Sequence, residues 1–331
     1  MSNTQLAIEG LDPHLAADLT SGLKHVEELL AAHIEGEYPL VEETARHLVL
    51  AGGKRLRPLL VLLTSHLGPE RGANIFKAAV ACELTHLGTL YHDDVMDEAA
   101  LRRGVTSANY RWGNAVAILT GDYLFAKTSA LLAEVGPEAV LLQALTFERL
   151  VIGQIQETQG PSDSEDPMAH YMKVVANKTA SLISTSARFG AMLSGADPRI
   201  TESITQFGEL IGIAFQLADD ILDIASESAQ SGKTPGTDLK EGIPTLVTIL
   251  ARRSDDPADA DLKEILAKPI TDEALLEKTL QRLRTHKAME EAREMLGATA
   301  SKAMALLDDL PETSVKQALL AVISAVINRS A

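Results

Sequence analysis

The chain has 331 residues, a net charge of −16 from 30 Lys and Arg against 46 Asp and Glu, and an aromatic content of 4%. So acidic a surface repels phosphate backbones, and few aromatic side chains are available to stack on bases, which argues against nucleic-acid binding. The single cysteine, Cys82, cannot form a disulfide within the chain, which fits a reducing compartment. The start of the chain lacks a secretory-signal pattern, and the longest apolar run, 318–327, is about half the length of a membrane span. We therefore predict a cytoplasmic protein with no membrane span.

The spacing of apolar residues predicts an almost entirely α-helical chain. Hydrophobic residues make up 46% of it and recur every three or four positions. Pairs such as Asp12-Pro13, Asp166-Pro167 and Asp256-Pro257 combine a capping side chain with a first-turn proline and mark helix starts. In chain order we expect helices at residues 13–34, 39–50, 54–67, 71–96, 114–134, 138–159, 167–194, 199–226, 242–252, 258–267, 272–308 with a potential break near Gly297, and 312–328.

Several of these helices are apolar over much of their circumference, which favours central helices surrounded by others. The stretches 97–113, 160–166 and 227–241 are rich in Gly, Ser or charge and are expected to be non-helical, but none resembles an interdomain linker. The sequence thus predicts one large helical bundle, with residues 1–331 forming a single domain.

A five-residue motif, DDxxD, occurs twice, each time at the end of an apolar helical segment. Its carboxylates are those of Asp93, Asp94 and Asp97 in the first copy and of Asp219, Asp220 and Asp223 in the second. The outer carboxylates of each copy lie four residues apart, on one helix face, where like charges repel unless a cation compensates them. Oxygen ligands without a suitably spaced His or Cys suit a hard cation, and few ligands per site favour Mg²⁺ over Ca²⁺. A solvated acidic helix end is the alternative, but two copies in similar apolar helices favour a metal site.

Basic residues flank the first aspartate motif. Lys54 and Arg57 follow two glycines at an expected helix start, where backbone N–H groups and charge-assisted hydrogen bonds suit a phosphate, although a basic surface is the alternative. Arg102 and Arg103 follow the motif within a few residues, so that cations and carboxylates converge. His86 precedes Asp93 by nearly two helical turns and can face the same cavity, although a core histidine is the alternative.

Polar residues also lie near the second motif, and for each a structural role is the alternative. Lys178 and Thr179 are in the middle of an expected helix, where small neighbours let a lysine reach into a cavity. Gln216 precedes Asp219 by three residues and should share its helix face.

The motifs GGKRLRP, HLGTLYHDDVMDEAALRRG, NKTA, and FQLADDILDI followed by GKTPGTDL resemble, in this order, those of the trans-isoprenyl diphosphate synthases, also called polyprenyl synthetases. The resemblance extends from about residue 40 to about residue 250. It implies the all-α isoprenoid synthase fold, a homodimer, and two aspartate-rich helices facing each other across a deep central cavity. It also implies head-to-tail (1′-4) condensation of isopentenyl diphosphate onto an allylic diphosphate, with three Mg²⁺ ions per active site.

The resemblance also implies a role for each candidate residue. Asp93, Asp97 and Asp219 would bind Mg²⁺, and Asp94, Asp220 and Asp223 would ligate or support it. Isopentenyl diphosphate would be held by Lys54, Arg57, His86 and Arg103, and the allylic diphosphate by Arg102, Lys178, Thr179, Gln216 and Lys233. Lys178, Thr179 and Gln216 would also shield the carbocation, and the released diphosphate would accept the proton. The chain departs from the family pattern at Ile243, where a lysine is common, and at Gln154, where an acidic residue is common.

Product length should depend on the depth of the cavity below Asp93. Thr89, Gly88 and Thr85 precede Asp93 by four, five and eight residues, and none is bulky enough to block a growing chain from this helix. We therefore expect a product of 20 carbons or more, and we expect Gly88→Phe or Thr89→Phe to shorten it. Release of so apolar a product would suit peripheral contact with a membrane.

Two alternatives remain open at this point. A terpene cyclase uses similar ionisation chemistry, although its second metal motif would be expected to mix Asn, Ser and Glu. A catalytically silent, diphosphate-binding subunit of a heteromeric synthase would be expected to have lost one aspartate motif, whereas both are intact here.

Overall fold

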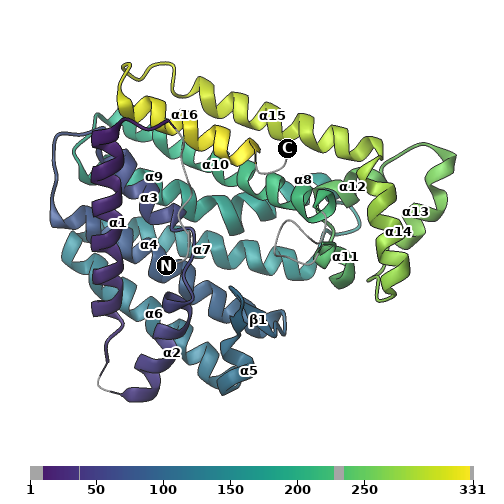
Figure 1. The fold of residues 1–331 in the computed structure, drawn as a ribbon, viewed down its shortest axis with the longest axis horizontal. Coiled ribbons are helices and arrows are strands. Elements are labelled where there is room, and N and C mark those ends of the chain that lie inside the picture. Colours follow the sequence, from purple (N-terminus) through teal and green to yellow (C-terminus); the bar gives the residue numbers. More distant parts are fainter. Residues whose placement is uncertain (1–9, 37, 227–234, 329–331) are drawn as a thin grey trace. The chain divides into compact units, whose positions relative to one another are not determined.

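The computed structural model describes residues 10–36, 38–226 and 235–328, and most of these residues are helical (Figure 1). The strands of this described part are the two-residue strands β1 (Leu101–Arg102) and β2 (Val105–Thr106), which pair antiparallel. The chain divides into two compact units. Unit 1 comprises Met1–Phe147, Leu182–Gly208 and Asp309–Ala321, and unit 2 comprises Glu148–Ser181, Glu209–Asp308 and Val322–Ala331.

The N-terminal helices belong to unit 1. They are α1 (Pro13–His33), α2 (Pro39–Leu50), α3 (Leu56–Ser65), α4 (Ala73–Met96), α5 (Ala108–Trp112) and α6 (Asn114–Val135). The expected start of α1 is confirmed, because the Asp12 carboxylate accepts hydrogen bonds from the backbone N–H groups of His14 and Leu15. The apolar helix α4 packs most extensively against α6, and the buried Tyr91 ties α4 to α2 by donating to the carbonyl of Thr44. The helix that ends in the first aspartate motif is therefore held on several sides.

Unit 2 contains α8 (Pro167–Val174), a π-helical turn η1 (Val175–Ala180), α11 (Thr237–Glu241), α12 (Leu246–Arg252), the short 3₁₀ turn η2 (Pro257–Asp259), α13 (Ala260–Ile265), α14 (Glu273–Arg284) and α15 (Lys287–Ala305). Four further helices have residues in both units: α7 (Pro137–Gln159), α9 (Ser181–Leu193), α10 (Pro198–Ala225) and α16 (Ser314–Ile327). Within unit 2, α12 packs against α15 and α8.

The π-helical turn η1 interrupts what the sequence predicted as one helix at 167–194. Glycines on two other helices contact it: a methyl group on Gly153 of α7 would lie 2.5 Å from the backbone nitrogen of Lys178, and one on Gly212 of α10 would lie 2.4 Å from Cα of Ala180. Arg149 also donates to the carbonyl of Ala176 at 3.1 Å. π turns often occur at functional sites, and this one contains the candidate residues Lys178 and Thr179.

Three further sequence expectations about the helices were wrong. The stretch 97–113 contains the β1–β2 hairpin and α5, and α11 lies in the expected non-helical stretch 227–241, of which 227–234 lie outside the described residues. The expected helix at 272–308 breaks between Arg284 and Lys287, where His286 caps the start of α15, and not at Gly297. The His286 side chain satisfies a backbone N–H at the new helix start, whereas a glycine inside a helix costs only about 1 kcal/mol and is tolerated at Gly297.

Candidate active site

The first aspartate motif lies at the C-terminal end of α4, and its three carboxylates have different environments. Asp93 is half-buried and Asp97 is exposed, whereas Asp94 is fully buried and accepts a hydrogen bond from Arg102 Nε at 2.5 Å. The backbone carbonyl of Asp94 also accepts a hydrogen bond from Asn109 of α5 at 2.9 Å. Burial raises the pKa of Asp94, although the Arg102 guanidinium opposes the shift. The middle aspartate thus anchors the segment after α4.

The second motif, on α10, shows the same division. Asp219 and Asp223 are half-buried, whereas Asp220 is 2% exposed and receives three hydrogen bonds. The Tyr171 hydroxyl donates to it at 2.6 Å, the Gln216 amide at 2.9 Å and the backbone N–H of Leu246 at 3.0 Å. Burial raises the pKa of Asp220 to about 6. Asp220 therefore joins α8, α10 and the start of α12, a role that the sequence did not distinguish from metal binding.

The donor chemistry of both motifs fits a hard divalent cation, because carboxylate oxygens are the ligands that Mg²⁺ prefers. One buried carboxylate oxygen, Asp94 Oδ2, has no hydrogen-bond partner among the residues that the structure describes. In that same part of the chain, no group of three or more His, Cys, Asp or Glu side chains is close enough to hold a metal ion by itself. Other ligands must complete the coordination shell, and diphosphate oxygens are suited to do so.

The glycine-rich segment before α3 is shaped by Arg55, which the sequence analysis had not singled out. Arg55 adopts a left-handed backbone conformation with φ of 48° and is 7% exposed. Its guanidinium forms ion pairs with Glu27 of α1 and Glu83 of α4, the latter at 2.7 Å, and donates to the carbonyl of Val49 at 3.1 Å. The Arg55 guanidinium is thus engaged in contacts within the fold. Its neighbour Lys54 is exposed, and Arg57 is half-buried.

Unit 1 brings together three of the four residues expected to hold isopentenyl diphosphate. Burial, reinforced by the positive charges on Arg57 and Arg103, keeps the pKa of the His86 imidazole well below its ordinary value, so this side chain is neutral near pH 7. Burial lowers the pKa of Arg57 as well, and Arg57 Nε is buried with no hydrogen-bond partner among the described residues. Arg103 donates to the carbonyls of Leu48 and Gly52. An anion of high charge density would supply the acceptor that Arg57 Nε lacks.

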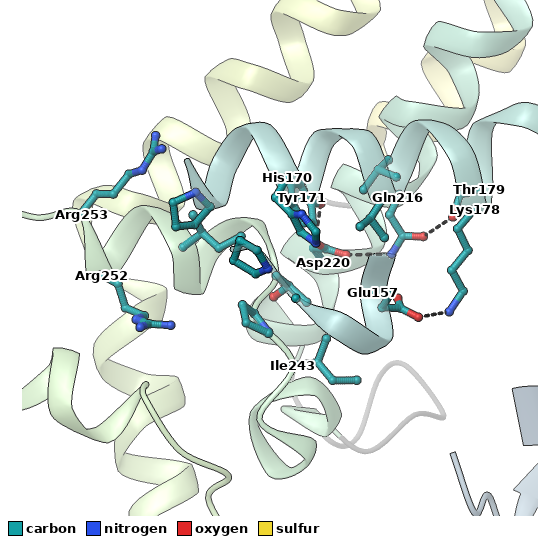
Figure 2. A pocket seen from close by; sticks show the side chains of 18 residues that line it. Glu157, His170, Tyr171, Lys178, Thr179, Gln216, Asp220, Ile243, Arg252 and Arg253 are labelled. Atoms are coloured by element: carbon teal, nitrogen blue, oxygen red, sulfur yellow. Dashed lines mark hydrogen bonds and ion pairs between the residues drawn. The ribbon is translucent and has the colours of Figure 1, made fainter. Parts of the chain in front are cut away.

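In unit 2 a cavity of about 510 Å³ is lined by three of the residues expected to face the allylic substrate, Lys178, Thr179 and Gln216 (Figure 2), whereas Arg102 belongs to unit 1. Thr179 donates to the Gln216 amide oxygen at 3.1 Å, and Gln216 in turn donates to Asp220, so the orientation of the amide is determined. Lys178 forms an ion pair with Glu157 at the end of α7. Figure 2 shows Thr179, Gln216 and Asp220 joined by hydrogen bonds, and Lys178 paired separately with Glu157.

The cavity is also lined by Ile243, one of the two departures from the family pattern, and by residues that the sequence analysis did not name. Ile243 lines the cavity and supplies an apolar side chain there. Arg252 and Arg253 at the end of α12 also line it, and Tyr171 approaches Asp220 from α8. The sequence analysis did not single out these three residues; the spacing of Tyr171, seven residues before Lys178, was the available signal. Lys233 lies outside the residues that the structure describes.

The proposed chain-length residues of α4 face different neighbours in unit 1. A methyl group on Gly88 would lie 2.7 Å from the Phe125 ring of α6, so this glycine is covered by an aromatic side chain. Thr85 is fully buried and accepts a hydrogen bond from Gln143 of α7 at 2.7 Å. Thr89 is half-buried and donates to the carbonyl of His86. Of the two substitutions expected to shorten the product, Thr89→Phe is the cleaner test, since Gly88→Phe requires Phe125 to move.

One helix in the described part of the chain, α6, is long and apolar enough to cross a membrane by length and composition. Core helices of soluble proteins meet the same criteria, so this single helix is weak evidence for a span. The absence of a membrane span and the cytoplasmic location stay predictions.

The chain belongs to the polyprenyl synthetase family, whose model matches residues 38–283. It is 44% identical over 319 residues to a nonaprenyl diphosphate synthase of Mycobacterium tuberculosis, covering 96% of this chain and 95% of the relative. It is 37% identical over 294 residues to heptaprenyl diphosphate synthase component 2 of Geobacillus stearothermophilus, covering 88% of this chain and 91% of the relative.

Among solved structures, the fold matches a geranylgeranyl pyrophosphate synthase from Corynebacterium glutamicum complexed with calcium and isoprenyl diphosphate. The TM-score is 0.88 at 41% identity, with 96% of this chain and 98% of that chain covered. These comparisons confirm the all-α isoprenoid synthase fold and the family resemblance found from the motifs.

Proposed function

We propose that this chain is an all-trans polyprenyl diphosphate synthase that adds isopentenyl diphosphate to an allylic diphosphate, forming a product of 20 carbons or more. The carrying observation is that both aspartate motifs share one design: a buried middle carboxylate that anchors the helix end and outer carboxylates placed four residues apart. Mg²⁺ is the expected ion at the outer carboxylates of Asp93, Asp97, Asp219 and Asp223, and three ions per site are implied by the family resemblance.

The binding groups suit two chemically distinct diphosphates. Arg57, His86 and Arg103 offer isopentenyl diphosphate two guanidinium groups and a neutral imidazole, and Lys54 adds an ammonium at the same segment. Lys178 is the corresponding cation of the unit 2 cavity, where it must exchange its ion pair with Glu157 for a contact with the allylic diphosphate. Arg102 is held by Asp94 and supplies a further positive charge beside the first motif.

The reaction begins with departure of diphosphate from the allylic substrate, and bound Mg²⁺ supplies the positive charge that stabilises this leaving group. The apolar side chains that line the unit 2 cavity, including Ile243 and Val175, exclude water that would otherwise quench the allylic carbocation. The oxygens of Thr179 and Gln216 are fixed by their mutual hydrogen bond and direct dipoles into this cavity. The double bond of isopentenyl diphosphate attacks the carbocation, and the released diphosphate accepts the proton that is lost.

The proposed homodimer is supported by exposed apolar side chains on the part of α7 that belongs to unit 1. Leu141 and Leu145 lie about one helical turn apart and are 60% and 52% exposed. Large exposed apolar patches mark interaction sites, and a second copy of this chain is the occupant that the family resemblance implies. Sedimentation of the wild type and of Leu141→Glu tests the dimer: a monomeric variant supports it, whereas a monomeric wild type refutes it.

The function is tested with the purified chain, Mg²⁺, labelled isopentenyl diphosphate and, separately, dimethylallyl, geranyl, farnesyl and geranylgeranyl diphosphates. Products that grow to one dominant length are expected, and EDTA, Asp93→Ala and Asp219→Ala should each abolish them. Asp255→Ala is the matched control, because this aspartate is exposed and outside both motifs.

The same assay distinguishes the alternatives. Cyclic hydrocarbons formed without isopentenyl diphosphate would identify a cyclase. Mg²⁺-dependent binding without turnover would identify a subunit that needs a second component, as the name of the Geobacillus stearothermophilus relative indicates for that protein. Either result refutes the proposed function.

A further inference from the structure

A buried carboxylate, Glu83, lies among the arginines of unit 1. Glu83 is 2% exposed and belongs to α4, ten residues before Asp93. Its Oε1 atom accepts a hydrogen bond from Arg55 Nη1 at 2.7 Å and lies 3.7 Å from Arg103 Nη2. Its charge also acts on Arg57, where it opposes the effect of burial on the pKa of that guanidinium.

The three arginines come from two segments that are far apart in the chain. Arg55 and Arg57 bracket the start of α3, and Arg103 lies in the β1–β2 hairpin with a positive φ of 53°. Without a shared counter-charge, three guanidinium groups in a partly buried volume would repel one another and separate. Glu27, the other carboxylate on Arg55, is 44% exposed and has no ion pair with Arg57 or Arg103 among the described residues.

We propose that Glu83 is a positioning residue for isopentenyl diphosphate: it joins Arg55 to Arg103, so that the hairpin and the start of α3 present Arg103 and Arg57 to one diphosphate. This inference rests on the proposed function and adds to it a residue that does not itself touch the substrate.

The test compares Glu83→Gln with Glu27→Gln, which removes the other carboxylate partner of Arg55. Glu83→Gln makes the region more positive, so a purely electrostatic role predicts tighter binding of the diphosphate and a lower KM. A positioning role instead predicts weaker binding of the diphosphate and a higher KM. We expect KM for isopentenyl diphosphate to rise about tenfold or more in Glu83→Gln, with KM for the allylic substrate changed less than twofold. In Glu27→Gln both KM values should stay within twofold of the wild type.

The outcomes separate this inference from the proposed function. A wild type that consumes no isopentenyl diphosphate refutes the function, whereas an active wild type with an unchanged or lowered KM in Glu83→Gln refutes only the positioning role. Equal loss of kcat with both substrates and no change in either KM would show a merely structural role and also refute it. If Glu83→Gln does not fold, Glu83→Asp replaces it in the test, because this variant keeps the negative charge but holds the carboxylate one methylene further from Arg55 and Arg103. An unchanged KM for isopentenyl diphosphate in folded Glu83→Asp overturns the proposal.

Discussion

Replacement of Gly153 of α7 is expected to lower both stability and rate, because this glycine contacts the π-helical turn that bears Lys178 and Thr179. A methyl group at this position would lie 2.5 Å from the backbone nitrogen of Lys178, whereas ordinary contact begins near 3.4 Å. The Gly153→Ala substitution therefore forces α7 and η1 apart by about 1 Å. Overpacking of this kind costs about 1–3 kcal/mol, and a displacement of about 1 Å at a catalytic site can lower the rate about 100-fold.

Gly297→Ala is the matched control, since this glycine also lies inside a helix but has no atom within 4 Å of an added methyl group. Both substitutions gain about 1 kcal/mol of helix propensity, so the difference between them isolates the steric effect. Urea unfolding and the steady-state rate with a saturating allylic substrate are measured for both. We expect Gly297→Ala to be neutral or stabilising and Gly153→Ala to be less stable and about 10- to 100-fold slower. Equal stability and equal rates in the two variants would refute the close-packing argument.

Three further predictions concern α4. Burial raises the pKa of the Cys82 thiol to about 12, so iodoacetamide at pH 8 should label this cysteine only in urea, and rapid labelling of the native protein would contradict its burial. Because burial and nearby arginines hold the folded pKa of His86 below its ordinary 6.5, the unfolded chain binds more protons below about pH 6.5 and stability falls as the pH drops. Urea unfolding at pH 5.5 and 7.5 should show a smaller fall in His86→Gln, and an identical fall would exclude this contribution. Thr89→Phe should shorten the dominant product in the chain-elongation assay, and an unchanged length would show that this helix face does not limit the product.

Local signals in the sequence predicted most helices closely because capping pairs and apolar spacing act within a few residues. Asp12-Pro13 is an example, since its cap needs only the next two backbone N–H groups. The π-helical turn could not be predicted in this way, because the glycines that pack against it, Gly153 and Gly212, belong to helices distant in sequence. The α4–Phe125 contact is likewise tertiary, so the argument from α4 alone treated the side of Gly88 as open.

The candidate site shows the same limit. Residue type and spacing identified Asp94 and Asp220 as members of metal motifs, but their anchoring role depends on Arg102 and Tyr171, which only the fold brings to them. Arg55 is part of the GGKRLRP motif, but the sequence did not predict a role for it, because its ion pairs with residues of α1 and α4 cannot be inferred from composition.

The division between buried middle aspartates and outer aspartates means that this chain can lose its activity without losing its fold. Substitution of Asp93 or Asp219 removes a proposed metal ligand while leaving the bonds of Asp94 and Asp220 intact, so such a chain should still fold and bind partners. Substitution of a middle aspartate instead leaves buried donors without an acceptor, so the variant protein should be unstable. Gene duplication can therefore produce inactive but well-folded copies of this chain by single changes at the outer positions, and these copies remain available for recruitment as binding subunits.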